Sequence, residues 1–205
     1  MHPEALNKKG KEIFSKFSTF SDFYLAGGTA LALQIGHRIS VDFDFFSKKP
    51  IEKNFLPKVK QVFSGKAVAP SVDNSDELTV FVDEVKLTFL YYPFPLLRPL
   101  PDYRDVSLLG IKEISATKAY TIGRRGSFKD YVDLYFVISE RHAALTEIME
   151  LAGKKYGQDF NSRLFLEQLV YLKDIEDTKV IFLKNKATKR DLEDFFTKEV
   201  AKIKL

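Results

Sequence analysis

The 205-residue sequence contains no cysteine, no tryptophan and only two methionines. The lack of cysteine excludes disulfides, thiol catalysis and thiolate zinc sites. Histidine is also scarce: His2, His37 and His142 are scattered along the chain, which argues against a His-rich metal site. No apolar run approaches the roughly 18 residues that a membrane-spanning helix needs. The first ten residues, MHPEALNKKG, contain no apolar signal segment, so we expect a cytoplasmic protein with no membrane partner.

A strong charge of either sign is missing as well. The sequence has 32 Lys and Arg against 28 Asp and Glu, a formal net charge of +4, which permits an anionic partner without requiring one. Apolar residues make up 45% of the chain, with 19 Phe and 9 Tyr, so it can bury a sizeable core and is not intrinsically disordered. This length suits one compact domain, or a core with a modest second lobe.

The N-terminal half alternates helix and strand patterns. Glycines 27 and 28 end a short apolar strand at 23–26, Thr29 is placed to cap a helix over 30–35, and Gly36 is placed to end it. Asp83 and Glu84 form a plausible hairpin turn between two strands. The spacing predicts further helices over 3–20 and 52–64, and strands over 41–46, 66–72, 78–82 and 85–92.

Strand patterns stop after a proline-rich crossing segment at 93–101. Beyond it the periodicity is helical throughout, so we predict an α+β fold in which a mixed β-sheet core, residues 1–110, precedes a C-terminal helical lobe, residues 111–205. The predicted helices of this lobe cover 112–122, 128–140, 144–156, 161–172 and 188–203.

Residues 24–46, YLAGGTALALQIGHRISVDFDFF, combine features that suit phosphate chemistry. A glycine turn lets backbone N–H groups approach an anion, and the following helix start favours negative charge. Asp42 and Asp44, two apart on a strand, project from one face and would repel each other unless a hard cation such as Mg²⁺ lies between them. A phosphate cradle beside paired carboxylates is what phosphoryl or nucleotidyl transfer requires.

Each element alone has an ordinary interpretation. A Gly-Gly turn is common, and acids that alternate with Phe43 and Phe45 also describe the wet face of an edge strand. Arg38 can contact a phosphate or serve only as a cation after a helix C-terminus. The order of the elements, with the aspartates following Gly28 closely, favours the functional interpretation.

These residues resemble the nucleotidyltransferase-fold toxins of the AbiEii/AbiGii type, from bacterial abortive-infection and toxin–antitoxin systems. The resemblance rests on AGGTALAL (26–33), HRISVDFDFF (37–46), VKLTFLYYPFPLL (85–97) and KAYTIGRRGSFKDYVDLY (118–135), and so covers about residues 20–140. It implies a nucleotidyltransferase-like core and Mg²⁺-dependent transfer, with Mn²⁺ as an alternative ion, of a nucleotide from an NTP to an acceptor. In related toxins that acceptor can be the 3′ end of tRNA, and a cognate antitoxin protein is an expected partner.

The resemblance also implies roles for individual residues. Asp42 and Asp44 hold the metal, and Lys118, Asp130 and Asp133 complete the catalytic set. The nucleotide-binding residues are then Gly27, Gly28, Thr29, Arg38, Arg125 and Lys129. On periodicity alone the later cations and acids would be surface ion pairs along amphipathic helices, because residues seven or three apart on a helix share a face.

One departure concerns the third carboxylate that many members of the wider superfamily carry on a later strand. The corresponding position here is Thr88, which cannot bridge metals as a carboxylate does. Three explanations stay open: Asp130 or Asp133 substitutes, the site holds one tightly bound metal, or the general base is missing. Two alternatives to the toxin activity therefore remain, a catalytically inactive nucleotide-binding module and a small-molecule nucleotidyltransferase of the antibiotic-modifying kind.

Residues 178–190 form a basic stretch with five cations and no acid. The stretch could follow a nucleic-acid backbone. Asp191, Glu193 and Asp194 come directly after it, which favours an ordinary solvated loop before the last helix.

Overall fold

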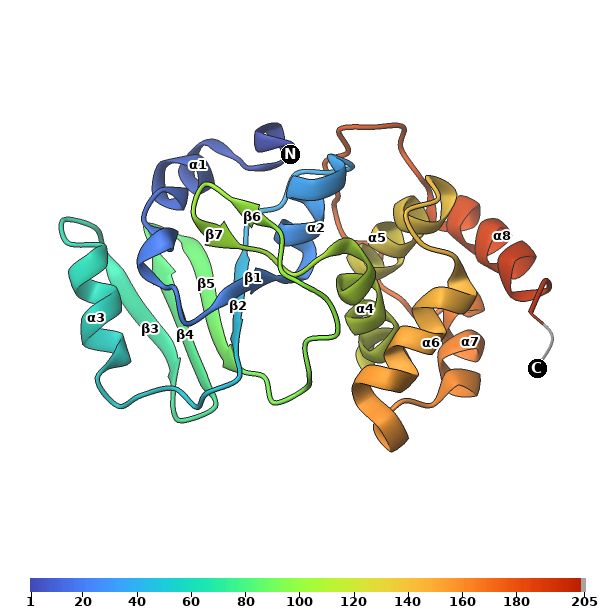
Figure 1. Cartoon of the computed structure of the whole chain (residues 1–205). Helices are drawn as coiled ribbons and strands as arrows, with labels where there is room; N and C mark the ends of the chain where they lie inside the picture. Colours follow the sequence, from blue (N-terminus) through green and yellow to red (C-terminus); the bar gives the residue numbers. More distant parts are fainter. Residues whose placement is uncertain (204–205) are drawn as a thin grey trace. The chain divides into compact units, whose positions relative to one another are not determined.

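The computed structural model describes residues 1–203 and divides into two compact units. The first, the sheet unit, comprises residues 1–95 and 99–109; the second, the helical unit, comprises 96–98 and 110–205. The expected division at residue 110 lies beside this boundary, but the short segment Leu96–Arg98 belongs to the helical unit. The predicted α+β class, with a mixed sheet followed by helices, is confirmed (Figure 1).

The sheet unit is built on five strands in the order β1-β2-β5-β4-β3. β2 pairs in parallel with β5, and the other neighbours are antiparallel. The strands are β1 (Tyr24–Ala26), β2 (Phe43–Ser47), β3 (Val68–Asp73), β4 (Glu77–Val82) and β5 (Val85–Tyr91), and a separate hairpin joins β6 (Asp102–Tyr103) to β7 (Val106–Ser107). The helices are α1 (Lys8–Phe14), α2 (Gly27–Ile35) and α3 (Phe55–Val62).

Phenylalanine fills one face of this sheet. Phe45 of β2 and Phe89 of β5 are paired in register and stack with ring centroids 5.0 Å apart. Phe17 and Phe20, from the chain after α1, pack edge-on against them. Because side chains alternate along a strand, this packing places Asp44 on the opposite face of β2 from Phe43 and Phe45. The aromatic core therefore fixes which face presents the carboxylate.

The N-terminal helix differs from its prediction over 3–20. The structure has two single 3₁₀ turns, Pro3–Ala5 and Phe17–Thr19, around α1. The Asn7 side chain accepts a hydrogen bond from the Gly10 amide at 2.7 Å and so starts α1 there, while the residue before it, Leu6, bridges to Ser40. This cap and this long-range bridge override the helical spacing.

The prediction that Thr29 caps α2 is wrong. α2 begins at Gly27, with Ala26 in the N-cap position, so Thr29 lies inside the first turn. The helix ends as predicted at Gly36, whose φ of +64° is the left-handed conformation that glycine adopts without strain. The β4–β5 turn at Asp83 and Glu84 is also confirmed.

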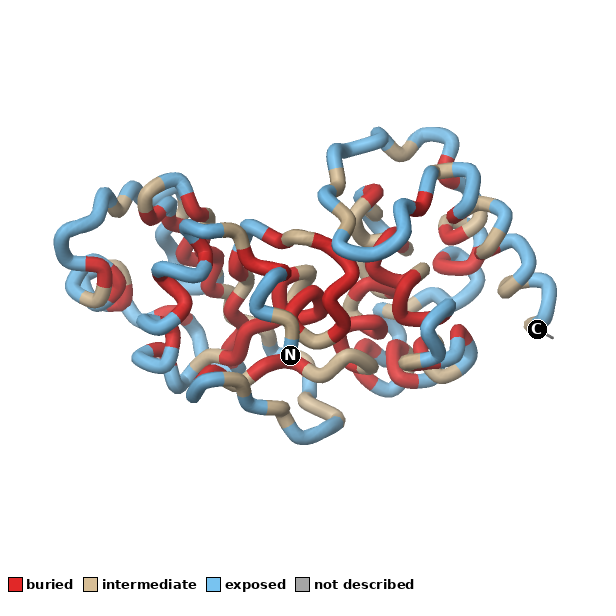
Figure 2. Tube along the Cα trace, turned by 90° about the horizontal axis from the view of Figure 1, so that it is seen from above, coloured by how far each residue is buried: buried red, intermediate tan, exposed pale blue. Residues whose placement is uncertain are grey.

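The helical unit contains five helices among the described residues, and α4 is their central member. α4 packs against α5, α6 and α7, and α8 contacts α5 and α7. Their bounds are α4 (Ile111–Arg125), α5 (Phe128–Ser139), α6 (Leu145–Tyr156), α7 (Ser162–Val170) and α8 (Lys189–Val200). The long segment between α7 and α8 is almost entirely exposed, apart from a few buried points such as Leu172 and Ala187 (Figure 2).

A buried ion pair ties α4 to α6 within this unit. The Lys155 ammonium lies 2.9 Å from the Glu113 carboxylate, and both side chains are almost completely inaccessible. The same carboxylate accepts hydrogen bonds from the Leu97 and Arg98 amides. These bonds explain why residues 96–98 belong to the helical unit although the chain on either side of them does not.

Candidate functional site

Asp44 is the second residue of β2, on the face opposite Phe43 and Phe45. It pairs with Ala26 of β1 on one side and with Thr88 of β5 on the other. The register therefore places Thr88 directly beside Asp44, at the strand position where the sequence lacks a carboxylate. Thr88 is buried, and its hydroxyl lies 3.4 Å from that of Thr79 on β4.

The position of the Asp44 carboxylate leaves room only for glycine at residue 27. A Cβ built on Gly27 would lie 2.5 Å from Oδ2 of Asp44, closer than any real contact, and the φ of Gly27 is +64°. Both the backbone conformation and the approach of the carboxylate exclude a side chain at this position. The start of α2 and the carboxylate of β2 are thus in direct contact.

Asp42 precedes β2 and is exposed, whereas the sequence pattern predicts a strand from residue 41. Its backbone carbonyl accepts a hydrogen bond from the Thr29 hydroxyl. Its carboxylate makes no hydrogen bond or ion pair with any residue in the described range 1–203. The backbone of Asp42 is therefore fixed while its charged group stays open to a ligand.

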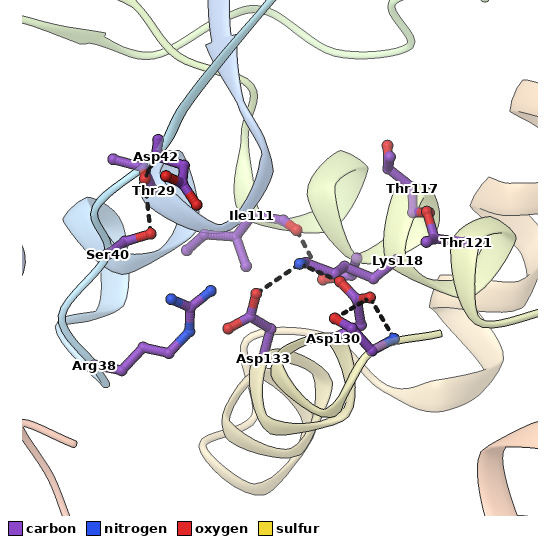
Figure 3. A network of polar contacts seen from close by, with 12 residues as sticks. Thr29, Arg38, Ser40, Asp42, Ile111, Thr117, Lys118, Thr121, Asp130 and Asp133 are labelled. Atoms are coloured by element: carbon purple, nitrogen blue, oxygen red, sulfur yellow. Dashed lines mark hydrogen bonds and ion pairs between the residues drawn. The ribbon is translucent and has the colours of Figure 1, made fainter. Parts of the chain in front are cut away.

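The Thr29 hydroxyl is used inside the protein. Thr29 is buried, and besides the Asp42 carbonyl it contacts the Ser40 hydroxyl at 2.7 Å (Figure 3). These bonds join the first turn of α2 to the loop that leads to Asp42. Arg38 on the same loop is also buried, and one of its guanidinium nitrogens donates to the Ile39 carbonyl at 3.2 Å.

The donor set of the sheet unit suits a hard divalent cation. It offers two carboxylates two residues apart, one of them exposed, beside the glycine-led start of a helix. Mg²⁺ favours one or two carboxylates supplemented by substrate phosphates and water. No cluster of three or more His, Cys, Asp or Glu side chains able to hold a metal occurs among residues 1–203, so the pair stands without a third carboxylate of its own.

The helical unit brings together Lys118, Asp130 and Asp133. The Lys118 ammonium, on α4, lies 2.6 Å from Oδ1 of Asp130 and 2.7 Å from Oδ2 of Asp133, both on α5 (Figure 3). The side chain of Lys118 is 9% exposed and that of Asp133 is 0% exposed. Lys118 is thus the hydrogen-bond donor of a nearly dry ion-pair network.

Asp130 has a second, structural use. Its Oδ2 accepts hydrogen bonds from the amide and the hydroxyl of Ser127, which completes a capping box at the start of α5. Burial acts to raise the pKa of the Asp130 carboxyl, but the charge and hydrogen bond of Lys118, with the Ser127 amide, outweigh it and hold the pKa below its ordinary value. Asp133 is completely buried, and its carboxylate pairs with the Lys118 ammonium.

Arg125 and Lys129 lie outside this network. Arg125 ends α4 and is exposed, and Lys129 is the second residue of α5 and is half-buried. Neither makes a hydrogen bond or ion pair with any of residues 1–203. Of the three cations that the family motif assigns to the nucleotide, Lys118 is therefore sequestered, whereas Arg125 and Lys129 remain available to an anion.

Most of the chain matches the sequence pattern of one protein family. The model of the nucleotidyl transferase AbiEii toxins of type IV toxin–antitoxin systems matches residues 11–202. The chain belongs to this family. It is a nucleotidyltransferase, and the resemblance found in its motifs is confirmed.

One relative and two solved structures are also similar to this chain. The chain is 32% identical to the uncharacterized protein aq_aa25 of Aquifex aeolicus over 95% of its own length and 96% of that protein. Its fold is similar to that of the nucleotidyltransferase toxin MenT4 of Mycobacterium tuberculosis, with a TM-score of 0.58, 16% identity, and coverage of 90% of this chain and 77% of the other. JHP933 of Helicobacter pylori gives a TM-score of 0.53 at 17% identity, with coverage of 96% and 95%.

No helix within the described residues has the length and apolar character that crossing a membrane requires.

Proposed function

We propose that this AbiEii chain transfers a nucleotide from an NTP to RNA, with the 3′ end of tRNA as the acceptor and Mg²⁺ as the metal, and that a cognate antitoxin restrains it. The observation that carries the proposal is the exposed Asp42 carboxylate beside Asp44, which is itself seated against Gly27. The close approach of Gly27 to Asp44 and the fixed backbone of Asp42, whose carboxylate is exposed, are typical of a ligand-binding site. A solvent-exposed face of an edge strand needs neither feature.

Asp42 and Asp44 would hold the ion. Bound there, Mg²⁺ supplies charge neutralisation and Lewis acidity to the phosphates. The Gly27 and Gly28 backbone would receive phosphate oxygens at the positive end of α2. Thr29 would not contact the ion or the phosphates itself. Its hydroxyl donates to the Asp42 carbonyl and so positions the Asp42 carboxylate.

The transfer itself needs a nucleophile, a proton acceptor and a stabilised leaving group. The acceptor hydroxyl oxygen attacks the α-phosphorus, the bond to the bridging oxygen breaks, and pyrophosphate leaves with the electron pair. Asp42 is the exposed carboxylate that can take the hydroxyl proton. The family motif assigns Lys118, Arg125 and Lys129 to the triphosphate, where cations offset the charge that grows on the leaving group.

The charge of the helical unit favours RNA over a cationic small molecule. By sequence it contains 19 Lys and Arg against 15 Asp and Glu, a net +4, whereas the sheet unit has 13 of each. The whole net positive charge of the chain thus belongs to one unit. An antibiotic-type acceptor, which is a cation, would be better served by an excess of acids.

A labelling experiment tests this function. Purified protein is incubated with each α-labelled NTP in turn, Mg²⁺ and total RNA, and in parallel with an aminoglycoside in place of RNA. Label on tRNA supports the proposal. Label on the aminoglycoside alone would make the chain a small-molecule enzyme, and NTP binding without any labelled product would make it an inactive binding module.

A further inference from the structure

A cavity of about 230 Å³ opens on the helical unit between the last turns of α4 and the start of α7. None of the residues to which the family resemblance gives a catalytic or nucleotide-binding role lines this cavity. Its walls are Tyr120, Gly123, Arg124, Asp159, Phe160 and Asn161, with Leu164 beside them.

One wall of the cavity ends in a stack of planar groups. The Arg124 guanidinium carbon lies 3.6 Å from the centre of the Tyr120 ring, and the Tyr156 ring stacks on Tyr120 with centroids 3.9 Å apart and planes 15° apart. Two groups this close to one ring centre must lie on opposite faces of it. The column therefore runs Tyr156, Tyr120, Arg124, and the exposed guanidinium forms its outer end.

The column is held rigid from both sides. The Tyr156 hydroxyl donates to the Thr117 hydroxyl at 3.1 Å, and an Arg124 Nη donates to the Asp159 carbonyl at 2.7 Å. A planar cation fixed in this way offers its outer face to another planar group without a further cost in side-chain entropy.

The rim of the cavity offers both a hydrogen-bond donor and an acceptor. The Asn161 side-chain oxygen caps α7 by accepting from the Leu164 amide at 2.9 Å, so its NH₂ group is left as a donor. The exposed Asp159 carboxylate, which makes no hydrogen bond or ion pair with residues 1–203, is an acceptor. The Phe160 ring provides a second apolar surface.

Gly123 keeps this space open. A glycine in a helix costs about 1 kcal/mol relative to alanine, yet a Cβ at Gly123 would meet only the Phe165 Cα, at 4.0 Å. Packing therefore does not require glycine here. A larger side chain at 123 would instead project into the cavity it lines.

We infer that this cavity binds one unpaired nucleobase of the RNA acceptor, stacked on the Arg124 guanidinium with its edge toward Asn161 and Asp159. Single-stranded RNA is recognised by stacking of splayed bases on aromatic rings or guanidinium planes, with hydrogen bonds to their edges. The inference rests on the proposed function, because it names where that RNA is held. The base of the NTP is the competing occupant.

The test uses a short single-stranded RNA carrying one 2-aminopurine, whose fluorescence falls when the base stacks. The full chain should quench it saturably. Gly123→Leu, which fills the cavity, should weaken RNA binding about tenfold or more and abolish the quenching. Gly153→Leu is the matched control: Gly153 is also helical, in α6, a Cβ there meets nothing within 4 Å, and binding should be unchanged.

Arg124→Lys separates stacking from charge. It keeps the cation and removes the plane, so we expect RNA to bind with the same salt dependence but without quenching. In transfer assays Gly123→Leu should raise KM for RNA and leave KM for NTP unchanged.

Two results would overturn the inference while leaving the proposed function intact. One is that Gly123→Leu and Arg124→Lys both quench the fluorescence as the wild type does and both keep the wild-type KM for RNA. The other is a change confined to the KM for NTP, which would assign the cavity to the substrate base. If the wild-type chain transfers nothing to RNA, the proposed function itself fails, and the inference falls with it.

Discussion

The sheet unit and the helical unit handle their charged residues in opposite ways. In the sheet unit, which has no net charge, the Asp42 carboxylate is exposed and makes no contact among the described residues. In the helical unit, which carries all the net positive charge, Lys118 is buried against Asp130 and Asp133. The sheet unit thus exposes a carboxylate, whereas the helical unit holds Lys118 in an internal ion-pair network. In the role proposed for Lys118 at the triphosphate, its ammonium would have to exchange or share these partners.

The largest effect should come from the two aspartates of the sheet unit. Asp42→Asn or Asp44→Asn should lower nucleotide transfer at least about 10³-fold, because each removes a charged ligand of the proposed Mg²⁺. The thermal midpoint should stay the same or rise slightly, since one of two repelling charges is lost. Asp73→Asn, on the exposed edge strand β3, is the control that should change neither quantity. Variants that unfold and keep activity in proportion to folded protein would show that the aspartates are structural.

The buried pair of the helical unit should respond differently. Lys118→Ala should slow the chemical step about 10²-fold and, unlike the aspartate variants, destabilise the fold by about 3–5 kcal/mol, because the buried carboxylates of Asp130 and Asp133 both lose the Lys118 ammonium. Urea unfolding and single-turnover transfer measure the two effects.

The double variant Lys118→Met with Asp133→Leu sharpens the contrast. Replacing Lys118 and Asp133 with apolar side chains should recover part of the stability, because only Asp130, which keeps its bonds to Ser127, is then left without the cation, and it should recover none of the activity. Recovery of activity in this variant would show that the pair serves the fold alone.

Acid should act on the helical unit through Asp130. Its folded-state pKa lies below the ordinary value, so it contributes stability above its unfolded pKa, and that contribution is lost as pH falls through the folded pKa. Asp130→Asn should therefore be less stable than wild type at neutral pH, and the difference should shrink on acidification below pH about 4. Urea titrations from pH 7 to pH 2 follow this difference. A gap that is constant over the whole range would assign the loss to the helix cap alone.

The smallest effect concerns the basic stretch 178–190, whose lysines fall into two sets. Lys184 pairs with Glu140 at 2.7 Å, and Lys189 donates to the Lys173 and Ile175 carbonyls. Lys179 and Lys186 are exposed, line one cavity of about 360 Å³ and make no ion pair with residues 1–203.

If the stretch follows RNA, Lys179→Ala with Lys186→Ala should lower the salt slope of binding by about 1–2 units. Neutralising Lys184, Lys186 and Lys189 together should also weaken binding, but the losses at 184 and 189 should lower the thermal midpoint too. Equal salt slopes for the wild type and the Lys179/Lys186 variant would leave the stretch as ordinary surface.

Local patterns were enough to predict most helices and strands and to single out the segment from Gly27 to Asp44 as a candidate site. The alternation in VDFDFF and the glycine turn before α2 are short-range signals, and the structure realises both with small shifts at the ends. The Ser127-x-x-Asp130 capping box was readable in the same way and would have revealed the structural use of Asp130.

What escaped prediction depends on contacts between distant residues. The position of Thr88 beside Asp44 was expected only from the family resemblance, because it follows from the register of two parallel strands, which no local pattern encodes. The Thr29 hydroxyl, expected to cap α2, instead donates to the Ser40 hydroxyl and the Asp42 carbonyl, which lie on the loop between α2 and β2. The β6–β7 hairpin was missed because each of its strands has only two residues and they directly follow the proline-rich segment 93–101.

The most direct test of the account follows the two ends of the triphosphate separately. The wild-type chain is given tRNA, Mg²⁺ and an NTP labelled either at the α- or at the γ-phosphate, with Asp42→Asn in parallel. The account predicts α-label on tRNA, γ-label in free pyrophosphate, and neither product from the variant. Label from the γ-phosphate on any acceptor, or equal α-labelling by Asp42→Asn, would contradict nucleotidyl transfer at the Asp42–Asp44 site.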